Sequence, residues 1–222
     1  MSEAQPGPTE IRRLAHRAVT DRDVIYSILD QGLVCHAGYV IDERPVVIPT
    51  LYARAGDSLF LHGSNSMGLA QAVRRGSPLC VTVTLLDGIV LARSAFESSA
   101  NYRSVVVHGH GRLIGDLEEK RRALANLTER LVPGRRADIR LSTEAEIRQT
   151  AVIELGLDTV SAKARSGSPE DDPADLSARV WAGVIPLRMV AGEPIPADDL
   201  AEGIEVPDYV RRYQSRLDPP SE

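Results

Sequence analysis

The stretch PVVIPTLYARAGDSLFLHGSNSMG, residues 45–68, contains the pattern that decides the fold. Two short runs rich in apolar and β-branched residues, 45–53 and 58–62, are separated by Arg54-Ala55-Gly56-Asp57, which is typical of a turn. The small polar residues at 63–66 then lead into a short helical pattern at 67–75, closed by Gly76. We therefore predict two adjacent antiparallel strands followed by a short helix.

Similar short runs continue on both sides of this stretch. Residues 33–41 precede it, and residues 79–86 and 89–94 flank Asp87-Gly88, a dipeptide that favours a two-residue hairpin. The further predicted strands are 102–114, 157–164 and 180–190, the last with Pro186 inside it, which indicates an edge strand or a bulge. Short antiparallel strands at this spacing predict a barrel or a sandwich.

Helical periodicity appears at three further places. Thr20, followed by Asp21 and Asp23, predicts the start of a helix that ends at Gly32. An amphipathic helix is predicted over 116–131, and another over 143–155 with Ser142 or Thr143 as its cap. Helices placed among hairpins favour an α+β protein in which a sheet curls and a helix covers an open end.

Bulk composition restricts the function. The chain has 222 residues, 43% hydrophobic and 26% charged, with a net charge of −5 and no run of five like charges, so we expect no nucleic-acid partner. No stretch resembles a signal peptide or a membrane span, so we expect a cytoplasmic protein that does not bind membranes. Cys35 and Cys80 lie in apolar runs and are predicted to be reduced, buried thiols.

The chain is predicted to contain one main domain. Residues 1–11 are polar and read as a disordered tail, residues 12–190 form the barrel, and residues 191–222 are a C-terminal extension. We assign no role to residues 133–156 or 193–222.

Three segments carry a resemblance to a known family: residues 45–68, GSPLCVTVTLLDGIVLARSAFESSANYRSVVVHGHGRLI at 76–114, and VWAGVIPL at 180–187. They are similar to the pyridoxamine-5′-phosphate-oxidase-like family of flavin-binding split barrels, nearest the nitroimidazole-resistance and flavin-nucleotide-binding branch. The resemblance implies a six-stranded antiparallel split β-barrel of the FMN-binding type. It also implies a homodimer with two flavin sites, each built from both subunits.

The resemblance assigns site residues by their place in the motifs. They are Val47, Ile48, Pro49 and Thr50 along the flavin ring; Leu61, His62, Gly63 and Ser64 at the ring and phosphate; Ser66, Met67 and Gly68 at the phosphate; Arg103 and Ser104 as polar contacts; and Trp181 from the partner subunit. An ordinary core strand at 47–50 and an ordinary capped loop at 63–66 remain alternatives.

One feature departs from the family pattern. Relatives place an Arg or Lys near the positions of Met67 and Gly68, against the phosphate, and this chain has neither. We predict that Arg103 takes this role, with Arg74 or Arg75 as substitutes.

His62 is the predicted catalytic residue. By resemblance it faces flavin and substrate, and an imidazole with a pKa near ~6.5 can deliver a proton near neutral pH. A hydrogen-bonded barrel histidine is the alternative. His108 and His110 lie two apart on a strand and could join His62 at a metal or haem, but no third ligand follows at a suitable spacing, and we predict no metal site.

Two functions stay open on this evidence. The first is an FMN-dependent oxidoreductase that takes hydride from a donor such as a reduced nicotinamide and reduces a small oxidant, for example a nitroaromatic or a quinone, through flavin N5. The second is a flavin or haem carrier without turnover. A deazaflavin in place of FMN also remains open.

Overall fold

The computed structural model describes residue 11 and residues 14–217, so the expected tail at 1–11 lies almost entirely outside the described residues. The strands are β1 Ala18–Val19, β2 Val34–Ile41, β3 Arg44–Ala55, β4 Ser58–Ser64, β5 Pro78–Leu91, β6 Ser99–His110, β7 Arg112–Leu113, β8 Thr150–Gly156, β9 Thr159–Arg165 and β10 Gly183–Pro186. The α-helices are α1 Arg22–Gln31, α2 Gly68–Arg74, α3 Leu117–Leu131, α4 Glu144–Gln149, α5 Asp208–Arg211 and α6 Gln214–Leu217, with 3-10 turns η1 Ala15–Arg17 and η2 Arg135–Ala137.

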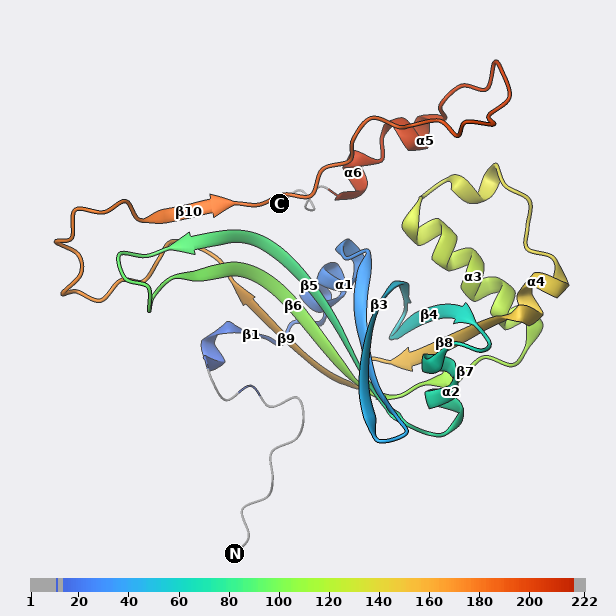
Figure 1. Cartoon of the computed structure of the whole chain (residues 1–222), viewed down its shortest axis with the longest axis horizontal. Coiled ribbons are helices and arrows are strands. Elements are labelled where there is room, and N and C mark those ends of the chain that lie inside the picture. Colours follow the sequence, from blue (N-terminus) through green and yellow to red (C-terminus); the bar gives the residue numbers. More distant parts are fainter. Residues whose placement is uncertain (1–10, 12–13, 218–222) are drawn as a thin grey trace, which may run out of the picture.

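The sheet closes on itself. Its antiparallel strand order is β1-β9-β6-β5-β2-β3-β4-β8-β7, with β10 added along β5. The chain runs from β6 into β7 after a single residue. Since β6 is third in this order and β7 is last, the two ends of the sheet are joined and the strands form a barrel (Figure 1). This confirms the predicted fold class, although the described residues form ten strands rather than six.

The residue between β6 and β7 is Gly111, at the point of closure. A Cβ there would lie 2.8 Å from Ile153 Cγ2 and 3.0 Å from Leu79 Cδ1. Only glycine lets the backbone pass so close to the core. Alternate residues of β4, β5, β6 and β8 fill the interior, where Leu59, Leu61, Val81, Val83, Val105, Val107, Ile153 and Leu155 are at most 1% exposed.

Two helices cover the barrel. The α1 helix, capped by Asp21 rather than by Thr20, buries Ile25, Ile28 and Leu29, and packs against β3, β5 and β6. The α3 helix, capped by Asp116, lies over β3, β4 and β8. Because α3 lies outside the sheet, a pocket is left between this helix and β4.

The prediction of a hairpin at Asp87-Gly88 is wrong. Both residues lie inside β5, where the register with β6 shifts by one residue between Leu86 and Gly88. Such a β-bulge uses the same residue types as a tight turn. A Cβ on Gly88 would lie 3.0 Å from the Ile185 carbonyl oxygen, so this glycine also admits β10. The β5–β6 turn comes later, over residues 92–98.

The predicted helix at 143–155 is only half correct. Thr143, one of the two predicted caps, forms a reciprocal capping box with Glu146 that starts α4. The helix ends at Gln149, and residues 150–156 form β8 between β4 and β7. Ala151, Val152, Ile153 and Leu155 are all buried, so no period-2 alternation distinguished this strand from a helix.

The two cysteines, both predicted to be buried thiols, differ in burial. Cys35 is fully buried, and burial raises the pKa of its thiol to about 12, whereas Cys80 is half-buried. None of the helices in the described residues is long and apolar enough to span a membrane.

The barrel core predicts a clear difference between two truncations. Leu59→Ala removes a fully buried side chain and should lower the free energy of unfolding by about 2–5 kcal/mol. Ile195→Ala, at a side chain 92% exposed, should change it by less than ~0.5 kcal/mol. Urea unfolding of the two variants measures this, and equal losses would contradict the assignment of the core.

Candidate functional site

The strand β4 presents His62 to the outside of the barrel. Leu59 and Leu61 point into the core, so the alternate residues Phe60 and His62 point outward, under α3. On the neighbouring strand Tyr52 pairs with Leu61 and is buried, so Leu51 lies on the same outer face as His62.

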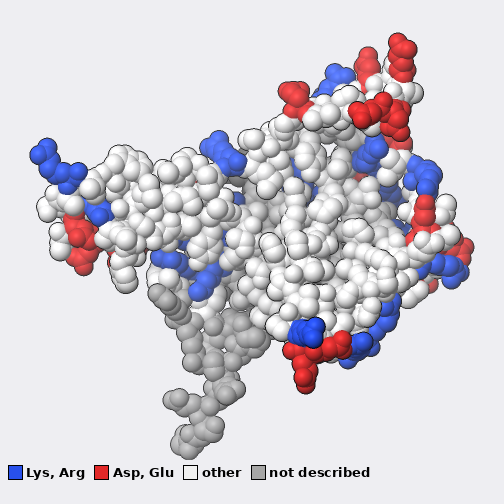
Figure 2. Space-filling view, viewed as in Figure 1, with Lys and Arg blue, Asp and Glu red and all other residues white. Residues whose placement is uncertain are grey.

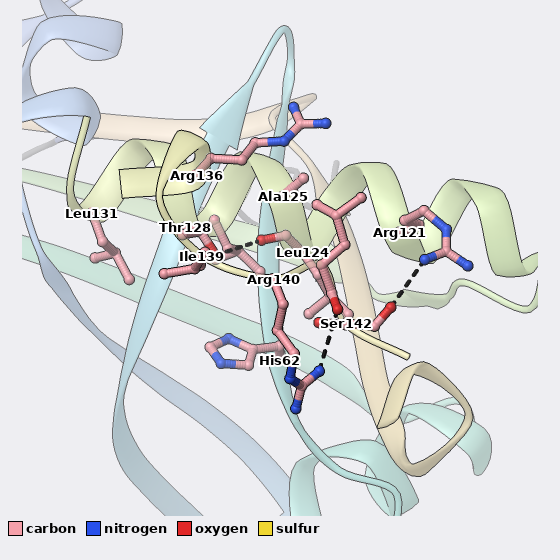
Figure 3. A pocket seen from close by; sticks show the side chains of 12 residues that line it. His62, Arg121, Leu124, Ala125, Thr128, Leu131, Arg136, Ile139, Arg140 and Ser142 are labelled. Carbon is pink, nitrogen blue, oxygen red and sulfur yellow. Dashed lines mark hydrogen bonds between the residues drawn. The ribbon is translucent and has the colours of Figure 1, made fainter. Parts of the chain in front are cut away.

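A pocket of about 200 Å³ opens between β4, α3 and the segment that follows α3 (Figure 3). Leucines of α3 form one wall, and the segment after η2 forms the other. His62 points into the space from the strand (Figure 3). The lining residues are His62, Arg121, Leu124, Ala125, Leu127, Thr128, Leu131, Arg136, Ile139, Arg140, Leu141 and Ser142.

His62 is half-buried without a hydrogen-bonding partner. Its Nδ1 is buried, and within the described part of the chain neither ring nitrogen makes a hydrogen bond. Burial lowers the pKa of His62 below its ordinary value, so the imidazole is uncharged at pH 7. A neutral imidazole is a good metal ligand but a poor proton donor at this pH, which favours a binding role over the predicted catalytic one.

The charged residues that line the pocket are all arginines. Arg121 donates from Nη1 to the Ser142 carbonyl at 3.0 Å, and Arg140 pairs with Glu146 at 2.6 Å, so both guanidinium groups hold the outer wall. Arg136 is exposed and makes no ion pair or hydrogen bond among the residues that the structure describes. A ligand carboxylate at the pocket mouth would therefore find an available cation.

These features together suit a particular kind of ligand. Apolar walls accept a flat hydrophobic group, the imidazole can coordinate a metal at its centre, and the guanidinium groups can bind acidic substituents. The described residues contain no cluster of three or more His, Cys, Asp or Glu that could hold a bare metal ion.

The predicted ring-binding residues lie on β3 but on two different faces. Val47 is 65% exposed and Pro49 is also exposed, whereas Ile48 and Thr50 are half-buried on the side of the core. The outward residues Val47, Pro49 and Leu51 thus form an open apolar bed that continues toward His62. Leu61 is fully buried, so only its backbone can reach a ligand.

The predicted phosphate loop is compact. Ser64 Oγ and Ser66 Oγ lie 2.9 Å apart and are exposed, and the Ser66 amide donates to Ser64 Oγ at 3.2 Å. Gly63 packs under the Met67 sulfur, where a Cβ would come within 2.3 Å. Gly68 faces the Tyr39 hydroxyl, which a Cβ would approach to 2.7 Å. A side chain at Gly63 would displace the flexible end of Met67, and one at Gly68 would displace the Tyr39 ring.

Among the basic residues proposed for the phosphate, Arg74 lies nearest this loop. Its Nη1 donates to the Asn65 carbonyl at 2.8 Å. Arg75 pairs with Asp42. Arg103 makes a two-pronged ion pair with Asp87 and a hydrogen bond to Gln31, and its strand β6 is separated from β4 in the sheet order by β5, β2 and β3.

The last two predicted contacts lie apart from the pocket. Ser104 is on β6 beside Thr84 and Lys163. Trp181 is 67% exposed and packs near Gly183, just before β10. The structure does not bring either residue to His62, and their predicted contact with a cofactor, through a partner subunit for Trp181, stays a prediction.

Sequence reasoning missed the outer wall of the pocket. Residues 133–156 had no assigned role, yet Arg136, Ile139, Arg140, Leu141 and Ser142 come from this segment. Its alternation of arginine with isoleucine and leucine at 135–141 was the available signal.

The lowered pKa of His62 predicts a pH-dependent stability. As the pH falls below about 6.5, the unfolded chain binds a proton that the folded protein does not, so the free energy of unfolding decreases. The free energy of unfolding, measured by thermal unfolding at pH 7.5 and at pH 5.5, should decrease more between these two pH values in the wild type than in His62→Gln. His110→Gln, at an exposed position, is the control and should behave as wild type; an identical slope in all three proteins would contradict this assignment.

One family model and several solved structures are similar to this chain, and two of those structures are described as flavin proteins. A family model described as pyridoxamine 5′-phosphate oxidase matches residues 21–164. The flavocytochrome Anf3 from Azotobacter vinelandii is 35% identical over 91% of this chain and 94% of its own, with a TM-score of 0.88. A protein from Mycobacterium smegmatis described as binding FAD and haem is 39% identical over 88% and 96%, with a TM-score of 0.84.

A more distant structure is a candidate 5-nitroimidazole antibiotic resistance protein from Bacteroides thetaiotaomicron, 25% identical over 66% of this chain and 85% of its own, with a TM-score of 0.56. No protein with a curated function matches the chain by sequence. Because the family model covers well over half of the residues, this chain belongs to the pyridoxamine 5′-phosphate oxidase family of split-barrel proteins.

Proposed function

We propose that this protein is a redox protein that binds a flavin and a haem. The observation that carries the proposal is His62, an uncharged and unpartnered imidazole facing an apolar pocket with arginines at its walls. Two similar structures, whose alignments each cover more than 85% of this chain, are described as a flavocytochrome and as an FAD- and haem-binding protein. These descriptions support the proposal.

The residues of the pocket fit a haem chemically. His62 would hold the iron, Leu124, Leu127 and Leu131 would contact the macrocycle, and Arg136 would bind a propionate. The space of about 200 Å³ is below the usual size of a ligand site. The outer wall would therefore have to move outward, or part of the ring would project into solvent. When bound, a haem supplies one-electron chemistry.

The exposed face of β3 is the proposed flavin bed. Val47 and Pro49 would contact the ring, with Ser64, Ser66 and Arg74 closest to its phosphate. A bound flavin accepts a hydride and can return electrons singly. Since Leu51 and His62 share this outer face, the two cofactors would lie on neighbouring strands. FMN, FAD and a deazaflavin all carry the planar ring that this bed would contact.

A homodimer belongs to the same proposal. The face shown in Figure 2 carries few charges over the middle of the strands, while acidic and basic side chains gather at the helical end, at the lower edge near the β2–β3 turn and at the far left near the β5–β6 turn. Exposed apolar residues on β3, on β5, on β10 and on the chain to either side of β10 are more numerous than a monomer needs: Val47, Leu51, Leu86, Trp181, Ile185, Met189 and Val190. A second copy would cover them and complete the flavin site.

We further propose an oxidoreductase that takes electrons from a donor such as a reduced nicotinamide in the cytoplasm and passes them to a small oxidant. The alternative is a carrier that holds its cofactors without turnover. Bleaching of the flavin by the donor, then recolouring by an oxidant, would favour the enzyme, and resistance to all physiological donors would favour the carrier.

Haem binding is tested by adding hemin to apo-protein. A Soret band should appear with one hemin per chain, and His62→Ala should lose it or weaken binding at least 10-fold because the axial ligand is removed. His110→Ala, which leaves the pocket unchanged, should bind as wild type. Full binding by His62→Ala would overturn the assignment of His62.

Flavin binding is tested by titrating apo-protein with FMN and FAD. Purified protein should absorb near ~450 nm, and Val47→Arg should weaken flavin affinity at least 10-fold because it puts a solvated charge on the ring bed. Ile195→Arg, at a highly exposed site away from β3, is the matched control. Unchanged affinity in Val47→Arg would show that the flavin lies elsewhere.

A further inference from the structure

The outer wall of the His62 pocket has no anchor in the core. Every residue from Pro133 to Glu146 is exposed, although Arg136, Ile139, Arg140 and Leu141 line the pocket from this segment. A segment without buried apolar contacts opens at low free-energy cost unless other contacts hold it. The position of this wall therefore depends on a small number of tethers.

The C-terminal segment supplies tethers on both sides of the pocket residue Leu131. Tyr209 Oη accepts a hydrogen bond of 2.9 Å from Arg135 Nη1. On the other side, Arg216 donates from Nε to the Arg130 carbonyl at 3.3 Å and from Nη1 to the Gln31 carbonyl at 3.3 Å. Figure 1 shows α5 and α6 returning to the end of α3 after the chain has crossed the molecule.

The turn that starts the wall is held from two directions. Gly134 has a φ of +90°, a conformation that favours glycine. Its amide donates to the Glu129 carboxylate at 2.7 Å, and a Cβ at this position would lie 3.2 Å from Tyr209 Cβ. The Tyr209 side chain thus packs directly on the turn and also binds the next residue. Arg136, whose guanidinium is available to a ligand, directly follows Arg135.

We propose that the C-terminal segment is a clasp in which Tyr209 positions the 134–142 wall, and that this clasp sets how long a carboxylate-bearing ligand stays in the His62 pocket. Tyr209 is a positioning residue, since it acts through Arg135 and Gly134 and does not line the pocket. The part that concerns ligand retention rests on the proposed function, because it takes haem as the ligand.

The positioning role is tested without any ligand. Hydrogen exchange of the apo-protein should be faster across residues 134–142 in Tyr209→Phe, and faster still in Tyr209→Ala, which also removes the ring. Tyr213→Phe is the matched control, because the Tyr213 hydroxyl makes no hydrogen bond within the described part of the chain. Unchanged exchange at 134–142 in both Tyr209 variants would overturn the clasp.

Ligand retention is tested with hemin. Transfer of bound hemin to excess apomyoglobin should be on the order of 3- to 10-fold faster in Tyr209→Ala than in wild type, with Tyr213→Phe unchanged. An equal transfer rate in Tyr209→Ala would overturn the role in retention. If the wild type binds no hemin, the haem assignment fails, while the exchange experiment still decides whether Tyr209 positions the wall.

Discussion

Closure of the sheet at Gly111 is the constraint on which the rest of the structure depends. The chain passes from β6 into β7 against Ile153 and Leu79, and β7 then pairs with β8 at the far end of the strand order. The closed barrel buries one side of its longer strands, β2 to β6. The outer side of β4, which carries Phe60 and His62, is covered from outside the barrel by α3.

The placement of α3 explains the chemistry of the candidate site. A helix over a strand leaves a narrow apolar space, and desolvation there holds His62 in its neutral form. The charges around this space are cationic, and two of the three arginines are already used to brace the outer wall. The site thus combines a metal-binding nitrogen, apolar walls and one available cation. This combination suits a flat aromatic ligand that has a metal at its centre and acidic substituents.

The outer faces of β3 and β4 connect the two proposed cofactor positions. Val47, Pro49 and Leu51 are exposed in the single chain, and His62 follows on the next strand. This continuity is a property of antiparallel pairing, since paired residues point to the same side. The exposed apolar bed beside the half-buried imidazole is the pair of observations that the proposed cofactor binding and the proposed dimer would both account for.

Local patterns in the sequence determined most strands of the barrel, the helix start at residues 142–143 and the helix over 116–131, because period and capping act within a few residues. Only the tertiary structure decided that Asp87-Gly88 is a bulge, since that depends on Arg103 and β10 lying beside it. It likewise decided that residues 150–156 are a strand, because burial on both sides removes the alternation that marks one. The pocket wall and its clasp join residues far apart in the chain, 74 positions for Arg135 and Tyr209 and 86 positions for Arg130 and Arg216. Pairings of that range leave no local signal.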